Sequence, residues 1–361
     1  MENNKLCISC FLPNEGKVCR HCGYVEPEKR RESLLPALDV LAERYIIGEV
    51  LSIDKSTVEY KAWDKQKNAV VEIQEYYPRE VVSRSAGSTQ LNIASSENRE
   101  NYFKNIATIK ENATRMFAFS DSPNIVNIFD CFEANNTVYI VKEYIEGMYL
   151  SDYIAMNGGR LDVETAVSVM TPVLDGLTQI HKFGLVHRSL TPKSIIITAE
   201  NEVKITDFRF LKEASPYKFE DMTVHFSPGY APPEQYRSKS KQGAFSDIYS
   251  AGAILYRMIA GAKPLDALNR SNEDGIRTLR ELDGNVPEHV DVSVMKALNL
   301  TPDLRFKSAA DFKNSLTAKK EVVDIDGRIV DMKKKKFNQN TVIMLAALVA
   351  AVALILYFIL R

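Results

Sequence analysis

The sequence predicts an α+β fold with two lobes, flanked by a small N-terminal zinc ribbon and one C-terminal transmembrane helix. Three features predict this arrangement: four cysteines within the first 22 residues, a central stretch in which short β-like runs precede amphipathic helices, and an uncharged apolar run near the C-terminus. The 361-residue chain has enough apolar content for a sizeable core. Its formal net charge of −1 gives no electrostatic reason to expect nucleic acid as a partner.

Changes in composition divide the chain into six parts. Strand-like runs occur at Thr57–Ala62, Ala69–Gln74 and Thr137–Glu143, and amphipathic helices are expected near 163–182, 245–260 and 290–299. Strands followed by helices indicate a two-lobed body. The predicted parts are a zinc ribbon (1–25), a charged helical linker (26–43), an N-lobe (44–146), a C-lobe (147–317), a basic juxtamembrane segment (318–340) and a transmembrane helix (341–360).

The N-terminal cysteines form a CxxC…CxxC pattern made by Cys7, Cys10, Cys19 and Cys22. Two such knuckles complete a closed four-sulfur shell, which suits structural zinc. The polar start of the chain is unlike a secretory signal, so we expect a reducing compartment in which clustered cysteines favour metal over disulfide. The alternative, a redox CxxC, would need a thioredoxin-like βαβ context, which this segment lacks.

The apolar run at 341–360 is long enough to cross a membrane as a helix. Twenty helical residues span about 30 Å, the thickness of the hydrocarbon layer. Lys333–Lys336 lie on its N-terminal side. By the positive-inside rule, we expect a single-pass protein of the cell membrane whose N-terminal domains are cytoplasmic.

The central body carries five motifs in a fixed order. They occupy residues 185–192 (LVHRSLTP), 204–209 (KITDFR), 227–236 (SPGYAPPEQY), 246–252 (SDIYSAG) and 304–306 (LRF). With these motifs, the stretch from Tyr45 to about Leu316 resembles the bacterial Hanks-type serine/threonine protein kinases. The resemblance implies a two-lobed kinase fold, whereas activity has to be judged from the residues that would perform it.

Most positions that would handle nucleotide differ from the family pattern. Gln74 replaces the third-strand lysine, and its expected glutamate partner on the next helix aligns with Asn112. Glu72 and Glu59 stand at two positions that normally line the adenine slot, where carboxylates would have to be desolvated. The three glycines of the phosphate-covering loop align with Ser52, Asp54 and Thr57.

The catalytic loop has also changed. Ser189 replaces the aspartate that accepts the substrate proton, and Ser194 replaces the asparagine that binds the second magnesium. Loss of a general base costs about 10²–10⁴-fold in rate. Asp207 is retained, either as a residual magnesium or nucleotide contact or as a capping carboxylate. We therefore expect zinc as the cofactor, and neither ATP nor magnesium.

Residues that serve as scaffold in the family are retained. The resemblance implies three structural roles for these residues: spine packing, a brace for the catalytic loop and a buried salt bridge. The residues are His187, Arg188, Phe208, Glu234, Asp247 and Arg305. Thr223, in the expected activation segment, is interpreted as an ordinary loop residue in preference to a phosphosite.

The sequence supports three hypotheses of function. The first is a membrane-anchored pseudokinase that works as a binding or allosteric signalling module, with an active kinase or a membrane complex as protein partner and no nucleic acid. The second is a divergent serine/threonine kinase that transfers phosphate from ATP, supported by Asp207. The third is an ATP-binding sensor without turnover, against which Glu59 and Glu72 argue.

The membrane topology is directly testable. Protease added to intact cells should leave the kinase-like body uncut, because Lys333–Lys336 keep it in the cytoplasm. An immunoblot against the body measures this, with permeabilised cells as the control in which it must be digested. Digestion of the body in intact cells would refute the topology.

Overall fold

The computed structural model describes residues 6–27, 31–94, 96–208, 211, 227–236, 240–271 and 274–317, together with the backbone of 322–323 and 329–330. The chain separates into one unit that ends at Thr317 and a second that begins at Ala318. In the second unit, β12 (Val322–Val323) pairs antiparallel with β13 (Ile329–Val330).

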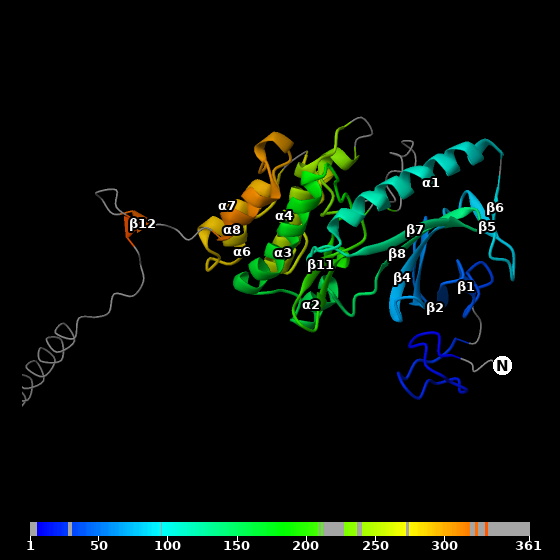
Figure 1. Ribbon diagram of the computed structural model, residues 1–361. Helices are drawn as coiled ribbons and strands as arrows, with labels where there is room; N and C mark the ends of the chain where they lie inside the picture. The colour runs from blue at the N-terminus through cyan, green and yellow to red at the C-terminus, as the bar shows by residue number, and fades with distance from the viewer. Residues whose placement is uncertain are drawn as a thin grey trace, which may run out of the picture. The chain divides into compact units, whose positions relative to one another are not determined.

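The N-lobe is built on a six-stranded antiparallel sheet with the order β1-β2-β3-β4-β8-β7 (Figure 1). Alternation along these strands separates two faces; on β4, Ile73 and Glu75 lie on one face, and Glu72 and Gln74 on the other. The strands are β1 (Val40–Leu41), β2 (Tyr45–Ile53), β3 (Thr57–Asp64), β4 (Ala69–Tyr76), β7 (Ile128–Ala134) and β8 (Thr137–Glu143).

A long helix and a small hairpin complete the N-lobe. Helix α1 (Ser96–Met116) packs on β7 and β8, and its buried residues recur at helical spacing, as Tyr102, Ile106 and Ile109 show. The hairpin consists of β5 (Val82–Arg84) and β6 (Leu91–Ile93), which pair antiparallel.

The expected helical linker is wrong in its described part. Residues 31–43 form turns and the short strand β1. Leu34 and Leu35 are buried in the sheet's core, and the Leu35 N–H donates to Tyr60 Oη at 3.2 Å. Apolar burial of these leucines outweighs the helix propensity of the charged residues around them, because propensity is only a weak preference.

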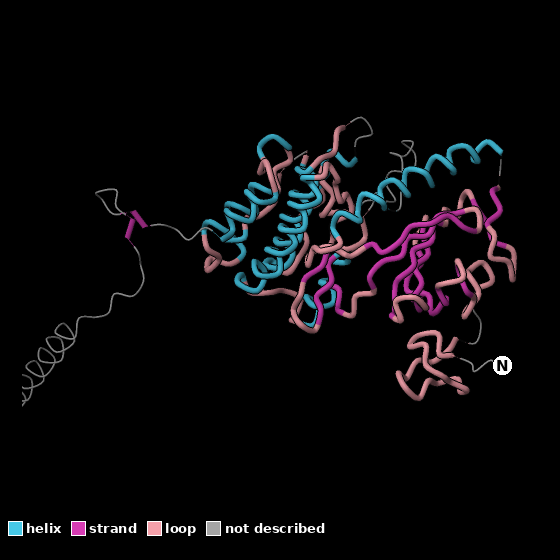
Figure 2. The backbone as a smooth tube through the Cα atoms, in the orientation of Figure 1, coloured by secondary structure: helices cyan, strands magenta, loops and turns pink. Residues whose placement is uncertain are grey.

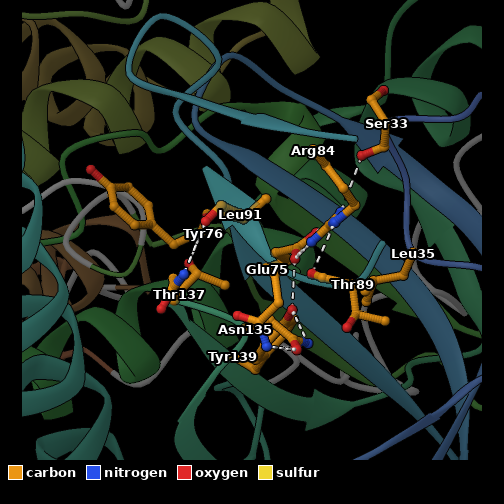
Figure 3. A network of polar contacts seen from close by, with 12 residues as sticks. Ser33, Leu35, Glu75, Tyr76, Arg84, Thr89, Leu91, Asn135, Thr137 and Tyr139 are labelled. Atoms are coloured by element: carbon orange, nitrogen blue, oxygen red, sulfur yellow. Dashed lines mark hydrogen bonds and ion pairs between the residues drawn. The ribbon is translucent and has the colours of Figure 1, made fainter. Parts of the chain in front are cut away.

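A buried ion pair fastens the hairpin to the sheet (Figure 3). The Arg84 guanidinium on β5 bonds the Glu75 carboxylate on β4, and both side chains are fully inaccessible to solvent. Tyr139 Oη donates to Glu75 Oε1 at 2.7 Å and Tyr60 Oη to Oε2 at 3.0 Å. Arg84 also donates to the Ser33 carbonyl, so the same network holds the 31–41 segment in place.

The C-lobe is mainly helical and carries one small sheet of order β11-β10-β9 (Figure 2). Helix α3 packs on both α4 and α8, and Asp162 caps its start by accepting from the Thr165 N–H. The strands are β9 (Gly147–Tyr149), β10 (Ile195–Thr198) and β11 (Val203–Ile205). The helices are α2 (Leu150–Met156), α3 (Val163–Lys182), α4 (Ala244–Ala260), α5 (Ala267–Arg270), α6 (Leu279–Leu282), α7 (Glu288–Ala297) and α8 (Ala309–Thr317).

The predicted two-lobed α+β body is confirmed. The three expected strands correspond to β3, β4 and β8, and the three expected helices to α3, α4 and α7. The predicted transmembrane helix at 341–360 lies outside the described residues. Within the part of the chain that the structure describes, no helix has both the length and the apolar character needed to span a membrane.

Breaking the buried pair should destabilise the N-lobe. Arg84→Met leaves the Glu75 charge without its buried partner, which costs about 3–5 kcal/mol of unfolding free energy and lowers the melting temperature by several degrees. Thermal melting of the full chain in detergent measures this. Lys104→Met, which removes an exposed ion pair with Glu100, is the control and should leave the melting temperature unchanged. An equal effect of both substitutions would contradict the assigned role of the buried pair.

Candidate functional site

Three charged side chains meet on the sheet face that carries Gln74. Lys142 on β8 lies beside Glu72 on β4 in the strand register, and Glu59 on β3 lies beside Gln74. Lys142 Nζ is 2.6 Å from Glu72 Oε1 and 3.1 Å from Glu59 Oε1. Ser52 Oγ on β2 donates to Glu59 Oε2 at 2.6 Å. We call Glu59, Glu72 and Lys142 the charged cluster.

Electrostatics keep Lys142 protonated. Its side chain is only 3% exposed, and burial by itself acts to lower the pKa of the ammonium. The Glu59 and Glu72 carboxylates outweigh this effect and hold the pKa of Lys142 well above its ordinary value. Burial raises the pKa of Glu72, and Glu59 raises it further against the opposing effect of Lys142. Two carboxylates thus share one buried cation.

Gln74 bonds the segment that follows the Asp-Phe motif. Its Nε2 donates to the Leu211 carbonyl at 2.8 Å, while Lys142 Nζ lies 3.4 Å from its Oε1. Leu211 is buried, and its N–H donates to the Phe208 carbonyl in a tight turn. The amide that replaces the family's lysine therefore uses both ends of its side chain within the protein.

The catalytic loop holds Ser189 in a local contact. Ser189 Oγ donates to the Asp207 carbonyl at 2.5 Å, and the Ser189 N–H bonds His187 Nδ1. Ser189 is thus a neutral hydroxyl engaged as a donor, unlike the carboxylate that serves as a general base in the family pattern. Asp207 is half-buried in a left-handed conformation with φ of 64°.

Ser194 is fully buried and works as a local cap. Its Oγ accepts from the Thr191 N–H at 2.9 Å and donates to the Thr191 carbonyl at 2.9 Å. The Thr206 N–H donates to the Ser194 carbonyl, which ties this turn to the strand end before Asp207. Ser194, which aligns with the metal-binding asparagine of the family, thus hydrogen-bonds main-chain groups of its own turn.

The predicted brace of the catalytic loop is present. Asp247 on α4 accepts from the N–H groups of His187 and Arg188 at 2.8 and 2.9 Å, and its Oδ2 lies 2.8 Å from His181 Nε2. Burial acts to raise the pKa of Asp247, but the His181 hydrogen bond and neighbouring charges hold it below its ordinary value. Burial lowers the pKa of His187, whose neutral ring lies 4.6 Å from the Phe208 ring.

The predicted buried salt bridge is also present. Arg305 Nη1 and Nη2 donate to the two oxygens of Glu234 at 2.7 and 3.0 Å. Ser246 Oγ donates to the same carboxylate, and Arg305 also donates to the Phe245 carbonyl. Such a bidentate, fully hydrogen-bonded pair satisfies both charges in the interior.

The structure brings together some of the predicted positions and adds two. Gln74 joins the charged cluster, and Ser189 contacts Asp207, while Asn112 is half-buried near the end of α1. Thr223 lies outside the described residues. Sequence reasoning missed Lys142 and Leu211. A lysine directly after the largely apolar run Val138–Val141 was the available signal for Lys142. Nothing local indicates that Leu211 turns inward.

The four N-terminal cysteines lie together as predicted, and their sulfurs are all within 4.8 Å of one another. Cys7 Sγ is 3.7 Å from Cys22 Sγ, and Cys10 Sγ is 3.6 Å from Cys19 Sγ. A tetrahedral zinc ion with bonds of about 2.3 Å needs sulfurs about 3.8 Å apart, so the donor set fits zinc.

Both knuckles share one backbone pattern. The Phe11 N–H donates to the Cys7 carbonyl, and the Gly23 N–H donates to the Cys19 carbonyl. Backbone N–H groups reach a sulfur in each knuckle, and those of Cys22 and His21 help to lower the pKa of the Cys19 thiol to about 6. Burial raises the pKa of the Cys7 and Cys10 thiols against the same kind of backbone donor. Donors aimed at sulfur favour the thiolate, which is the form that binds metal.

A comparison with protein families gives one match over most of the chain: the protein kinase domain, at residues 60–321. The probable serine/threonine-protein kinase PknB of Lactococcus lactis is 31% identical over 225 residues, which are 60% of this chain and 34% of that protein. Serine/threonine-protein kinase PrkC of Bacillus subtilis is 31% identical over 201 residues, 54% of this chain and 31% of that protein. The chain spans about a third of these relatives' length.

Solved structures show the same fold. The apo form of PpkA-294 superposes with a TM-score of 0.69 at 23% identity, covering 79% of this chain and 99% of that one. The kinase domain of PknI from Mycobacterium tuberculosis gives a TM-score of 0.55 at 18% identity, covering 78% and 98%.

Metal analysis tests the cysteine site. The purified full chain should contain one zinc per molecule, and Cys19→Ser Cys22→Ser should lose it, because two thiolates cannot close the tetrahedral shell. Cys131→Ser is the matched control and should keep its zinc, since Cys131 lies on β7 outside the cluster. Zinc content that is unchanged in the double variant would refute this site.

Proposed function

This chain belongs to the protein kinase domain family, and we propose that within it the chain is a pseudokinase that works as a membrane-anchored binding or allosteric signalling module. The observation that carries the proposal is the charged cluster. Lys142 and the carboxylates of Glu59 and Glu72 occupy the sheet face where the family would seat the adenine base.

A nucleotide that entered this site would have to separate Lys142 from the carboxylates of Glu59 and Glu72. An adenine ring offers no carboxylate to replace those of Glu59 and Glu72, so its entry would leave Lys142 unpaired in the interior. Breaking a buried ion pair costs about 3–5 kcal/mol, and a water-filled slot would forgo the apolar contact that an adenine ring needs. Either outcome weakens nucleotide binding.

The side chains that bind phosphate and accept the substrate proton in the family pattern are also replaced. Gln74 carries no charge and is bonded to Leu211 and close to Lys142, so it cannot replace a lysine ammonium. Ser189 is a hydrogen-bond donor to a main-chain carbonyl. Catalytic groups act as a unit, so we expect the retained Asp207 alone to contribute little to phosphate transfer.

A divergent kinase is the second candidate. The relatives PknB and PrkC bear the name serine/threonine-protein kinase, and the comparisons favour this candidate over the first. Asp207 is present. Gln74 stands at the position of the family's lysine, and the Lys142 ammonium lies 3.4 Å from its Oε1, close to where that lysine's charge would be needed. In this candidate Lys142 would leave its carboxylates and contact phosphate.

The anchoring and the partner rest on sequence. Residues 341–360 and Lys333–Lys336 support a single-pass membrane protein with a cytoplasmic body. An active kinase or a membrane complex is the expected protein partner, and capture from membranes with and without Glu234→Gln, which disturbs the C-lobe scaffold, would identify it.

Nucleotide binding decides between the candidates. We expect no change in the melting temperature at millimolar Mg-ATP, whereas a ligand at a hundredfold excess over its Kd would stabilise the fold by about 2.7 kcal/mol. We also expect no radiolabel transfer to the chain itself or to a generic substrate. The triple variant Glu59→Val Glu72→Ala Lys142→Met, which restores an apolar slot, should gain an ATP-dependent shift.

The controls separate the three outcomes. Asp207→Ala should behave as the parent does if the chain is a pseudokinase. Label transfer that is abolished by both Asp207→Ala and Lys142→Met would establish the divergent kinase. A melting shift without transfer, lost in Asp207→Ala, would indicate the ATP-binding sensor.

A further inference from the structure

The first cysteine knuckle forms hydrogen bonds with strand β2 of the N-lobe sheet. The Glu49 N–H on β2 donates to the Ile8 carbonyl at 2.8 Å, and Ser9 Oγ donates to Glu49 Oε1 at 2.7 Å. Ile8 and Ser9 are the two residues between Cys7 and Cys10. A change in the metal shell therefore acts directly on residues that bond β2.

Phe11 is held in a backbone conformation that its side chain disfavours. It has φ of 60°, while the equivalent residue of the second knuckle is Gly23 with φ of 73°. Glycine adopts this region freely, and a bulky residue does so only when its surroundings hold it there. The Phe11 ring is buried, with its centroid 6.0 Å from that of Trp63 on β3.

Gly48 leaves room for this contact. A Cβ at Gly48 would lie 2.4 Å from the Ile8 carbonyl oxygen and 2.6 Å from Phe11 Cζ. The lobe's own Lys61 carbonyl would also lie within 2.8 Å. The knuckle thus packs against bare backbone on β2, at a distance that any side chain there would prevent.

The contact continues to the segment that joins the lobes. Lys61 Nζ on β3 lies 3.7 Å from Glu49 Oε1 and 4.4 Å from the centroid of the Tyr144 ring. Tyr144 directly follows the end of β8, two residues after Lys142. A continuous set of contacts therefore runs from Ser9 through Glu49 and Lys61 to Tyr144.

We infer that the first knuckle is an integral layer of the N-lobe, so that zinc occupancy controls the order of β2 and β3 and of the residues around Tyr144. Metal supplies most of the folding free energy of so small a module. Without it, the contacts with Trp63 and Cys7 alone would have to hold Phe11 at positive φ, and we expect Phe11, Ile8 and Ser9 to leave β2 and β3. A ribbon joined to the lobe only as a flexible appendage would have no such effect.

Trp63 provides the test, because it is the chain's single tryptophan. Removing zinc from the full chain in detergent with a chelator should shift Trp63 emission to longer wavelength as the Phe11 ring leaves, and added zinc should reverse the shift. Thiol titration reports zinc release independently of emission. Release of zinc with unchanged Trp63 emission would overturn the inference.

Phe11→Gly is the matched decoupling variant. It makes the first knuckle like the second, so it should bind zinc at least as tightly as the parent, because the backbone strain is relieved. Its Trp63 emission should start shifted to longer wavelength and respond little to the chelator. A parent-like chelator response in Phe11→Gly would show that the coupling does not run through Phe11 and would overturn it.

Amide hydrogen exchange tests the extension to the lobe junction. Zinc removal should speed exchange at the Glu49 amide about tenfold, as expected for loss of its hydrogen bond to Ile8. Exchange in residues 143–146 should also increase in the parent, and should become independent of zinc in Lys61→Met, which keeps the Trp63 response. Exchange at 143–146 that never responds to zinc in the parent would refute this part of the inference.

Discussion

A buried ammonium has to be paired, and this requirement at Lys142 organises the interior face of the N-lobe. With its side chain 3% exposed, Lys142 needs carboxylates close by, and β3 and β4 supply Glu59 and Glu72 at neighbouring register positions. Gln74 then fits between the cluster and the Leu211 carbonyl as an uncharged side chain. A lysine at position 74 would place a second cation next to Lys142, so an uncharged residue at position 74 is compatible with a buried Lys142.

The scaffold of the C-lobe is held by interactions within the chain that do not involve nucleotide. Asp247 holds two backbone N–H groups of the catalytic loop, and Glu234 with Arg305 closes a buried bidentate pair, all through groups of the chain itself. These interactions stabilise the fold whether or not phosphate is transferred. Ser189 and Ser194 differ from the family pattern, and both hydroxyls donate to main-chain carbonyls of the chain itself.

Much of this could be predicted from sequence, because it depends on local pattern. Strand-like runs predicted β3, β4 and β8, and the cysteine spacing predicted a cluster that the structure confirms. Lys142 was missed because its meaning lies in register across three strands, which no single segment contains. The 31–43 segment was misjudged because burial of Leu34 and Leu35 against a distant sheet outweighs local charge. Contacts between segments far apart in sequence thus mark the limit of prediction here.

The N-lobe is stabilised on its two sides by different chemistry. On one face, the fully buried Glu75–Arg84 pair joins the hairpin and the 31–41 segment to the sheet without any ligand. At β2, the cysteine knuckle contributes Phe11 at positive φ and a backbone hydrogen bond, and on our inference both depend on the metal that holds the four thiolates together. The first arrangement needs no ligand, whereas the second, on this inference, depends on metal. A conditional support next to Lys61 and Tyr144 can change the junction between the lobes while the core of the sheet stays folded, which a pseudokinase would need if it signals by shape instead of by phosphate transfer.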